Sequence, residues 1–388
     1  MEPSSKRTRG RGGGSSGVDR LSALPDDLLH AILSSLKARQ VVQTSVLSRR
    51  WRSLWRSVPC LDVDEDDFRV NPEPLTSQNQ KDLGKFEDFV NSLLLRRDGS
   101  VLDTFRLCVY ESFAGHAHAG TWIRRALACS LRALHVHCDA FDDVVHMPLD
   151  LGPSLTRLHL SNLSLDARFA ESVSSVCVVL EDLELIGCGL CFDNITSTSL
   201  RNLCIETGTP DYDRPAPRLT SLRLLIQDQF FQVSVNEMPS LVKASISYWS
   251  PDEEAAIQET QRKLVSNVGN VTTLELTDFL QMMVPDVEPV EFPAFRNLRN
   301  LVLVGCDLRD DFQLLRHFLQ KSPNLEELTI RCCWLPEGFA GDQGTTKLKK
   351  LKYIEIIYKY HQGIRELVCF LLEISDRVPK NTITLTKV

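Results

Sequence analysis

The most regular feature of this chain is a repeated alternation of leucines and other residues that begins near residue 102. Eleven segments follow the pattern L-x-x-L-x-L, some of them loosely, and they start at residues 102, 131, 155, 180, 200, 219, 241, 271, 298, 325 and 351. Alternate apolar positions predict a short strand with one buried face. Because a single copy cannot bury that face alone, neighbouring copies are expected to stack into a curved solenoid.

Three copies extend the pattern to L-x-x-L-x-L-x-x-C-x-L when isoleucine is allowed for leucine. They read LEDLELIGCGL, LRNLVLVGCDL and LEELTIRCCWL, and they place Cys188, Cys306 and Cys333 at the turn after the strand. This pattern, with copies 19 to 30 residues apart, is typical of leucine-rich repeats. We expect these thiols to serve buried backbone groups at the turns. After the last copy, apolar residues at helical spacing over 364–372 predict a helix that caps the solenoid.

Residues 21–55 show a different pattern, in which apolar residues recur at helical spacing. Pro25, followed by Asp26 and Asp27, is a favourable helix start because acidic residues complement the positive end of the helix dipole. The wide apolar face of this helix consists of Leu28, Leu29, Ile32, Leu33 and Leu36. A second helix is predicted to carry Val42, Val46, Leu47, Trp51, Leu54 and Trp55 on one side and Arg49, Arg50, Arg52 and Arg56 on the other.

These two helices carry more apolar surface than a unit of about 40 residues can bury by itself. The segment contains no cysteine that could stabilise it through a disulfide bond, and tryptophans such as Trp51 and Trp55 are typical interface hot spots. Either a partner protein or the chain's own repeats must cover this surface. An acidic connector and one further predicted helix, with apolar residues between 86 and 94, separate the two regions, which favours a partner.

The composition excludes several classes of protein. The 388 residues are 43% hydrophobic and 24% charged, and 51 acidic against 44 basic residues give a net charge of −7, so we expect no nucleic-acid partner. The chain contains no stretch that approaches 18 uncharged apolar residues, so no membrane-spanning helix is predicted. Twelve cysteines spread over the chain are typical of a reducing compartment, and we expect the nucleus and/or the cytoplasm. The basic residues before position 12 are either an import signal or a solvated tail.

Groupings with metal-binding or catalytic potential have simpler explanations. Cys188 and Cys191 form a C-x-x-C pair, but no second pair lies at metal-binding spacing, and the repeat already explains Cys188. His135 and His137 are expected on one face of a strand and Cys138 on the other, so the three cannot easily bind one ion. We therefore expect no cofactor, no metal and no catalytic residues in this chain.

The N-terminal segment resembles an F-box in the form common in plants. The residues that carry the resemblance are LPDDLLHAILSSL and VVQTSVLSRRWRSLW. FVNSLLLRRDGSVLDTFRL and TWIRRALACSLRALHV resemble the connecting segments of plant F-box/LRR proteins, and the end of the chain, from LKYIEI to DRVP, is more loosely similar to their FBD region. The resemblance implies docking on a Skp-type adaptor, and through it on a cullin, by Leu24, Pro25, Leu28, Ile32, Leu33, Leu36, Val46, Leu47, Trp51 and Trp55.

The resemblance implies a non-catalytic substrate receptor of an SCF-type ubiquitin ligase, whose repeats bind a target protein. Side chains beside the inward leucines should face the concave surface because strand side chains alternate. The candidates for target contact are His135, His137, Arg157, His159, Asp182, Glu184, Asn202, Arg223, Lys243, Glu275, Asn300, Glu327, Arg331, Tyr353 and Glu355. Two alternatives stay open: a scaffold that docks on the adaptor without supporting ubiquitin transfer, and a receptor for a small ligand.

The sequence thus predicts an α/β chain with a helical F-box, a curved leucine-rich-repeat solenoid and a C-terminal helical cap. The expected organisation is a disordered basic and Gly/Ser tail over 1–18, the F-box over 19–60, an acidic linker and connecting helix over 61–98, the solenoid over 99–345, and the terminal repeat with the FBD-like cap over 346–388.

Overall fold

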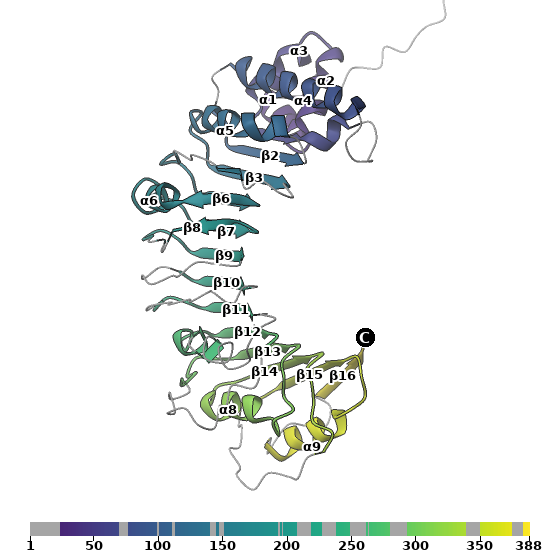
Figure 1. Cartoon of the computed structure of the whole chain (residues 1–388), viewed down its shortest axis with the longest axis vertical. Coiled ribbons are helices and arrows are strands. Elements are labelled where there is room, and N and C mark those ends of the chain that lie inside the picture. The colour runs from purple at the N-terminus through teal and green to yellow at the C-terminus, as the bar shows by residue number, and fades with distance from the viewer. Residues whose placement is uncertain are drawn as a thin grey trace, which may run out of the picture.

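The computed structural model shows an elongated, bowed stack of parallel strands with helices at both ends (Figure 1). The N-terminal helices lie at one end, and the last strands and helices lie at the other. The structure describes residues 24–69, 77–98, 101–110, 113–139, 145–146, 151–192, 195, 197–207, 219–226, 238–248, 261–262, 264–279, 293–338, 350–374 and 383–388. The tail over 1–18 and the start of the predicted F-box lie outside these residues.

The first predicted helix forms as α1 (Asp26–Leu33), with Pro25 immediately before it and Asp26 and Asp27 in its first turn. The second predicted helix is broken, because α2 (Ala38–Gln43) passes into a 3₁₀ turn (Thr44–Val46), and α3 (Trp51–Leu54) begins only after four further residues. The break contains three hydroxyl side chains, and Thr44 Oγ1 donates to the carbonyl of Val41 at 2.7 Å. Such bonds compete with continued helix, so apolar spacing alone predicted too long a helix here.

Each of the eleven predicted repeat segments forms a strand that starts two residues after the first residue of the segment. In the described part of the chain these strands belong to one sheet of thirteen, and every register pair in it is parallel. In sheet order the thirteen strands are β1 (Cys60–Asp64), β2 (Thr104–Tyr110), β3 (Ala133–Asp139), β5 (Arg157–Ser161), β7 (Asp182–Ile186), β9 (Asn202–Thr207), β10 (Ser221–Ile226), β11 (Lys243–Tyr248), β12 (Thr273–Thr277), β13 (Asn300–Val304), β14 (Glu327–Arg331), β15 (Tyr353–Tyr358) and β16 (Ile383–Lys387).

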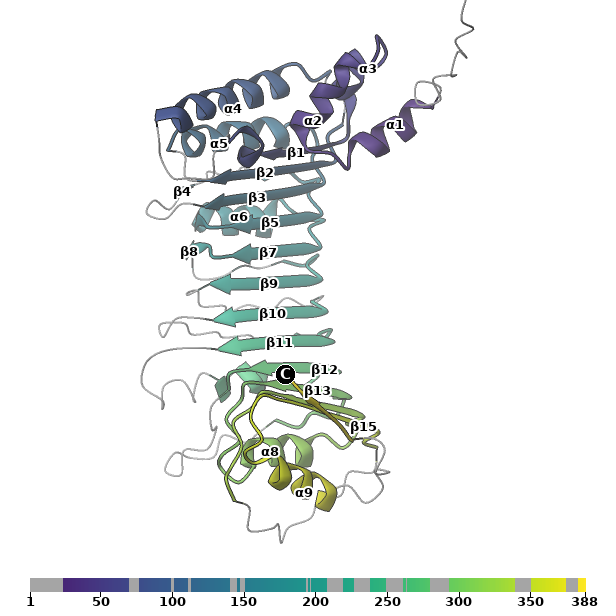
Figure 2. The ribbon, with the colours of Figure 1, turned by 90° about the vertical axis from the view of Figure 1, so that its right-hand side faces the viewer.

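One face of this sheet is covered and the other is open. Figure 2 shows the open, concave face of the stack from the front, with helix α6 (Ala167–Ser175) behind the strands on the covered side. The inward leucines and isoleucines of successive strands align in register, as in the pair Leu158 and Leu183, and are buried. The covered side also contains a small parallel sheet of β4 (Val145–His146), β6 (Leu163–Asp166) and β8 (Gly189–Cys191).

The remaining helices connect neighbouring strands. Helix α5 (Phe113–Leu127) lies between β2 and β3, and α8 (Gln313–Lys321) lies between β13 and β14. The predicted capping helix forms as α9 (Ile364–Ile374), with Leu367, Phe370 and Leu371 buried. One strand that the sequence analysis did not predict, β16, follows it and pairs with β15.

The segment expected to be a linker contributes to the sheet. Residues 60–64 form β1, which pairs with β2 through Leu61 beside Phe105 and Val63 beside Leu107. Both inward side chains are buried. A short 3₁₀ helix (Glu65–Phe68) and α4 (Ser77–Leu95), the predicted connecting helix, follow β1. The apolar alternation of LDVD is short and lies among acidic residues, and its partner strand lies some 40 positions away. For these reasons a linker was predicted where the chain begins the sheet.

The three repeat cysteines occupy the predicted turns as free thiols. Cys188 Sγ lies 3.4 Å from the carbonyl oxygen of Leu160, and Cys306 Sγ lies 3.4 Å from that of Leu276. Cys333 Sγ lies 3.5 Å from the carbonyl oxygen of Leu303. Each thiol therefore donates to a backbone carbonyl of the strand in the preceding coil, as the repeat pattern predicts.

A glycine at the same turn provides a test of this packing. Gly305 has φ +61°, and a Cβ at this position would overlap the carboxylate of Asp278. We expect Gly305→Ala to lower the free energy of unfolding of the full chain by at least about 1–2 kcal/mol, because the left-handed region is unfavourable for alanine and Asp278 must shift. Urea unfolding followed by circular dichroism measures this change. Gly338→Ala is the matched control, since nothing lies within 4 Å of its added Cβ; equal effects of the two variants would contradict the account.

Candidate functional site: two protein-binding surfaces

Four large aliphatic side chains in the described part of the predicted F-box remain exposed. We call Leu28, Ile32, Val46 and Leu47 the F-box patch; their exposed fractions are 52%, 43%, 85% and 63%. Helix α1 positions the first two, and the segment after α2 positions the others. Arg50 forms an ion pair with Asp26, and its Nε lies 3.1 Å from Oδ1 of that carboxylate. This pair brings the turn that follows Leu47 next to the start of α1, so the two parts of the patch lie on neighbouring segments.

The other predicted adaptor contacts, apart from Pro25, are less accessible. Pro25 is exposed, whereas Leu24 and Leu36 are half-buried and pack against the core. Leu33, Trp51 and Trp55 are buried, with exposed fractions of 0%, 4% and 7%.

The prediction that the tryptophan surface needs a partner to cover it is therefore wrong. The core that buries Trp51 and Trp55 runs without interruption from the N-terminal helices into the solenoid. β1, which begins the sheet, packs against α2, and Trp55 lies beside Phe89 and Leu93 of α4. The three buried side chains can support the F-box patch from beneath but cannot offer much contact surface of their own.

A cavity lies where the N-terminal helices meet α4. Its volume is about 460 Å³, and Val42, Trp55, Phe68, Phe89 and Leu93 form its apolar part. It is remote from the open sheet face, so it gives no support to a small ligand bound among the repeats.

The open sheet face carries all fifteen predicted target-contact residues. Strand register aligns them in three rows that run along the solenoid. The first row contains Arg157, Asp182, Asn202, Lys243, Asn300, Glu327 and Tyr353; the middle row contains His135, His159, Glu184, Arg223, Glu275 and Glu355; and the third row contains His137 and Arg331. Arg106, which was not among the predicted residues, extends the middle row beside His135 and occupies the matching position of LDTFRL.

Several of these side chains bind each other. His159 Nδ1 lies 2.9 Å from Oε2 of Glu184, and the rings of His135 and His159 are 4.4 Å apart between centroids. Arg106 lies 3.7 Å from Asp62 of β1. The N-terminal part of the face is therefore a connected polar cluster.

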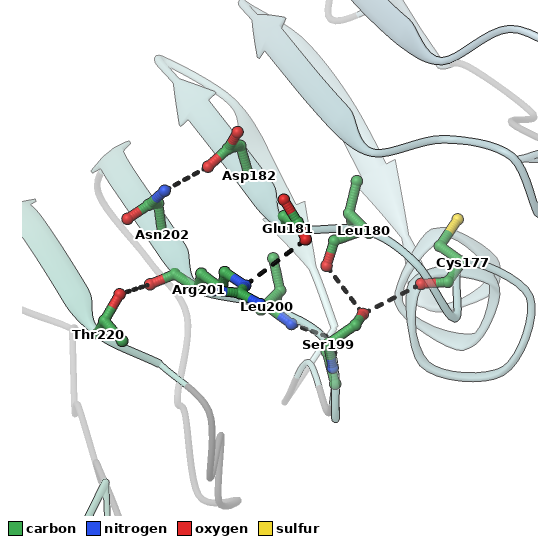
Figure 3. Close-up of polar contacts among 10 residues, drawn as sticks. Cys177, Leu180, Glu181, Asp182, Ser199, Leu200, Arg201, Asn202 and Thr220 are labelled. Carbon is green, nitrogen blue, oxygen red and sulfur yellow. Dashed lines mark hydrogen bonds and ion pairs between the residues drawn. The ribbon is translucent and has the colours of Figure 1, made fainter. Parts of the chain in front are cut away.

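Coil-to-coil contacts fix the neighbouring part of the face (Figure 3). The amide of Asn202 donates to the carboxylate of Asp182, and Arg201 Nε lies 3.5 Å from Oε1 of Glu181. Below them, Thr220 Oγ1 donates to the carbonyl of Arg201 at 3.1 Å. The bond from Thr220 recurs at equivalent threonines of two other coils, Thr156 and Thr272, so it belongs to the repeat. The pair Asn202–Asp182 belongs to the surface that a target would meet.

The comparisons with known proteins agree with this architecture. The F-box domain model matches residues 21–62, and the model described as At1g61320/AtMIF1, LRR domain, matches residues 121–373, more than half of the chain. The chain is a plant F-box/LRR protein.

Curated relatives support the same family. The F-box/LRR protein is 31% identical over 342 residues to the rice MEIOTIC F-BOX protein MOF, covering 81% of this chain and 72% of the relative. It is 28% identical over 447 residues to the Arabidopsis F-box/FBD/LRR-repeat protein At1g78750, covering 98% and 92%, and 26% identical over 429 residues to the Arabidopsis putative FBD-associated F-box protein At5g56390, covering 95% and 92%.

The described residues of this F-box/LRR protein show no group of three or more His, Cys, Asp or Glu side chains placed to hold a metal ion. Of the C-x-x-C pair, Cys188 is buried, and burial raises the pKa of its thiol to about 11. Cys191 is exposed and lies 3.9 Å from Ser164. No helix within the described ranges is long and apolar enough to cross a membrane.

The polar cluster has a pH dependence that can be measured. Burial, with His159, Arg106 and Arg157 nearby, lowers the pKa of His135 to about 4. As the pH falls below about 6.5, the ordinary histidine pKa, the unfolded chain takes up this proton before the folded chain does. The free energy of unfolding should therefore decrease as the pH falls from about 6.5 to about 4.

We expect His135→Gln to make this decrease shallower, because glutamine keeps the polarity of the position but binds no proton. Urea unfolding of the full chain at a series of pH values measures the slope. Identical slopes for the original and substituted chains would contradict the pKa assignment.

Proposed function

We propose that this F-box/LRR protein is the substrate-recognition subunit of an SCF-type ubiquitin ligase. F-box domains typically bind Skp-type adaptors, and within the described residues of this domain the F-box patch offers the exposed large aliphatic side chains. The solenoid would hold a target protein on its open face. The observation that carries the proposal is the contrast between the F-box patch, which is aliphatic, and the open sheet face, which carries rows of polar side chains.

The contribution of the chain to ubiquitin transfer would be positional. A target held on the sheet face would be kept close to the ubiquitin-carrying enzyme that the adaptor and the cullin bring to the complex, which raises the effective concentration of its lysines. No catalytic grouping is needed in the chain for this role. The continuous core between F-box and solenoid supports it, because a rigid connection keeps the target at a fixed position relative to the adaptor.

We also propose that the protein works in the nucleus and/or the cytoplasm. Its twelve cysteines are free thiols, and several of the buried ones are used as hydrogen-bond donors at repeat turns. Such thiols persist in a reducing compartment.

The F-box patch gives the first test. We expect Leu28→Ala combined with Leu47→Ala to weaken binding of the full chain to a plant Skp-type adaptor by at least about tenfold, because truncated interface anchors typically lose more than about 1 kcal/mol each. Isothermal titration calorimetry measures the affinity. Both side chains are more than half exposed, so the thermal unfolding midpoint should stay unchanged.

Leu95→Ala is the matched control, because Leu95 is a 76% exposed leucine at the end of α4. It should leave the affinity for the adaptor unchanged. Unaltered affinity of the double variant would overturn the assignment of the F-box patch.

The buried tryptophan should behave in the opposite way. Trp51→Ala should lower the free energy of unfolding by about 3–5 kcal/mol, as expected for truncating a buried aromatic side chain. Urea unfolding of the full chain measures this loss. A stable Trp51→Ala variant that fails only in adaptor binding would show that Trp51 is a direct contact after all.

A further inference from the structure

Two large aromatic side chains are exposed on loops at the far end of the solenoid, apart from Tyr353 on the sheet face. Trp334, just after β14, has 59% of its surface exposed, and Tyr360, just after β15, has 66%. Neither residue lies in the rows of the open sheet face. Exposed tryptophan and tyrosine side chains are enriched at protein interfaces, where they act as anchors.

The loops that carry these aromatics are packed against each other. Gly363, with φ +74°, lies so close to the other loop that a Cβ would be 2.5 Å from Cβ of Leu335 and 2.6 Å from the carbonyl oxygen of Pro336. Gln362 Nε2 also donates to Glu337 Oε1 at 2.6 Å. The two aromatic side chains therefore project from one fixed framework.

An arginine is held beside the tryptophan. The carboxylate of Asp307, which is only 5% exposed, accepts from Arg309 Nε at 3.0 Å and from Nη2 at 2.8 Å. The guanidinium carbon of Arg309 lies 5.8 Å from the centroid of the Trp334 ring. The backbones of Asp307 and Trp334 pair with each other as well. Because these groups are already ordered, binding at this point would lose little side-chain entropy.

Two cationic side chains lie on the stretches of chain that carry the aromatics. Lys359 Nζ lies 5.5 Å from the centroid of the Tyr360 ring, and exposed Arg331 ends β14. Arg331 and Lys359 form no ion pair with any described residue, whereas the nearby Asp307 is neutralised by Arg309. Glu337 of the same loop accepts from Gln362, so Arg331, Lys359 and Glu337 together leave one positive charge, opposite in sign to the net charge of −7 of the chain, which complements an acidic partner.

We infer that this distal patch, made of Arg309, Arg331, Trp334, Lys359 and Tyr360, binds a short acidic segment of the target protein. An apolar side chain of that segment packs on Trp334, and its carboxylates interact with Arg331 and Lys359. The inference rests on the proposed role as a substrate receptor and gives that role a location and a target chemistry. It extends target binding from the open sheet face onto the loops at its far end.

A random peptide library displayed on phage tests the inference without knowledge of the target. The library is selected on the immobilised full chain, and the best peptide is synthesised with a fluorophore for anisotropy titrations. We expect selected peptides rich in Asp and Glu around one large apolar residue. Trp334→Ala should weaken binding of that peptide by at least about tenfold, and Arg331→Glu combined with Lys359→Glu should weaken it similarly and abolish its sensitivity to salt.

The controls separate this inference from the proposed function. Leu95→Ala, which removes an exposed leucine far from the patch, should leave peptide binding unchanged. All these variants should bind a plant Skp-type adaptor with unchanged affinity, since they do not touch the F-box patch. Failure of the original chain to bind the adaptor would count against the proposed function alone, because the peptide selection does not use the adaptor.

Three results would overturn the inference. The first is a selection that yields no acidic peptide, and the second is that selected peptides bind the Trp334→Ala variant as tightly as the original chain. The third is that Arg223→Glu, in the middle of the sheet face, abolishes peptide binding while Trp334→Ala has no effect. Unchanged thermal unfolding midpoints in the variants are required for each comparison.

Discussion

The parallel pairing of β1 with β2 is the contact on which the arrangement of this protein depends. It places Leu61 and Val63 in the same buried layer as the repeat leucines, and it brings the N-terminal helices onto the end of the sheet. Lys37, which precedes α2, lies 3.0 Å from Asp62 and 2.9 Å from Asp64. Burial alone would lower the pKa of Lys37, but its hydrogen bonds to Asp64 and Asp62 raise it above the ordinary lysine value. These partly exposed ion pairs orient the junction, while apolar burial supplies most of its stability.

The same junction explains why the F-box is split into a buried and an exposed part. A small helical unit alone could not cover Trp51 and Trp55, but a sheet end and α4 can. The F-box patch is what remains exposed. Which apolar residues belong to it depends on the tertiary packing, because the hydrophobic pattern alone does not distinguish them from the buried ones. Repetition gives the rest of the molecule a different surface. Each coil is fixed to the previous one through its strand, its turn thiol or its threonine, so outward side chains fall into straight rows.

Local patterns predicted the repeats well because a period of two within a strand is a local property. The register of Leu158, Leu183 and the other inward residues, and the outward position of His135 or Glu184, follow from that alternation. Contacts between distant segments were not predictable in this way. Trp51 is buried in a core that includes β1, whose partner strand lies far along the chain, and the helix break near Thr44 contains a side-chain hydrogen bond. The exposure of Trp334 depends on how the loop at Gly363 packs beside it. In the template, Trp334 occupies only a variable position between Cys333 and Leu335.

Hydrogen–deuterium exchange of the free full chain, followed by mass spectrometry, tests the central claim most directly. If β1 joins the F-box to the solenoid without a partner, peptides covering Cys60–Asp64 contain slowly exchanging amides in the free chain. Addition of a plant Skp-type adaptor should then leave these amides unchanged and protect only the region from α1 to Leu47. Exchange at Cys60–Asp64 as fast as in exposed loops, slowing only when the adaptor is added, would show that the junction forms on binding and would contradict the account.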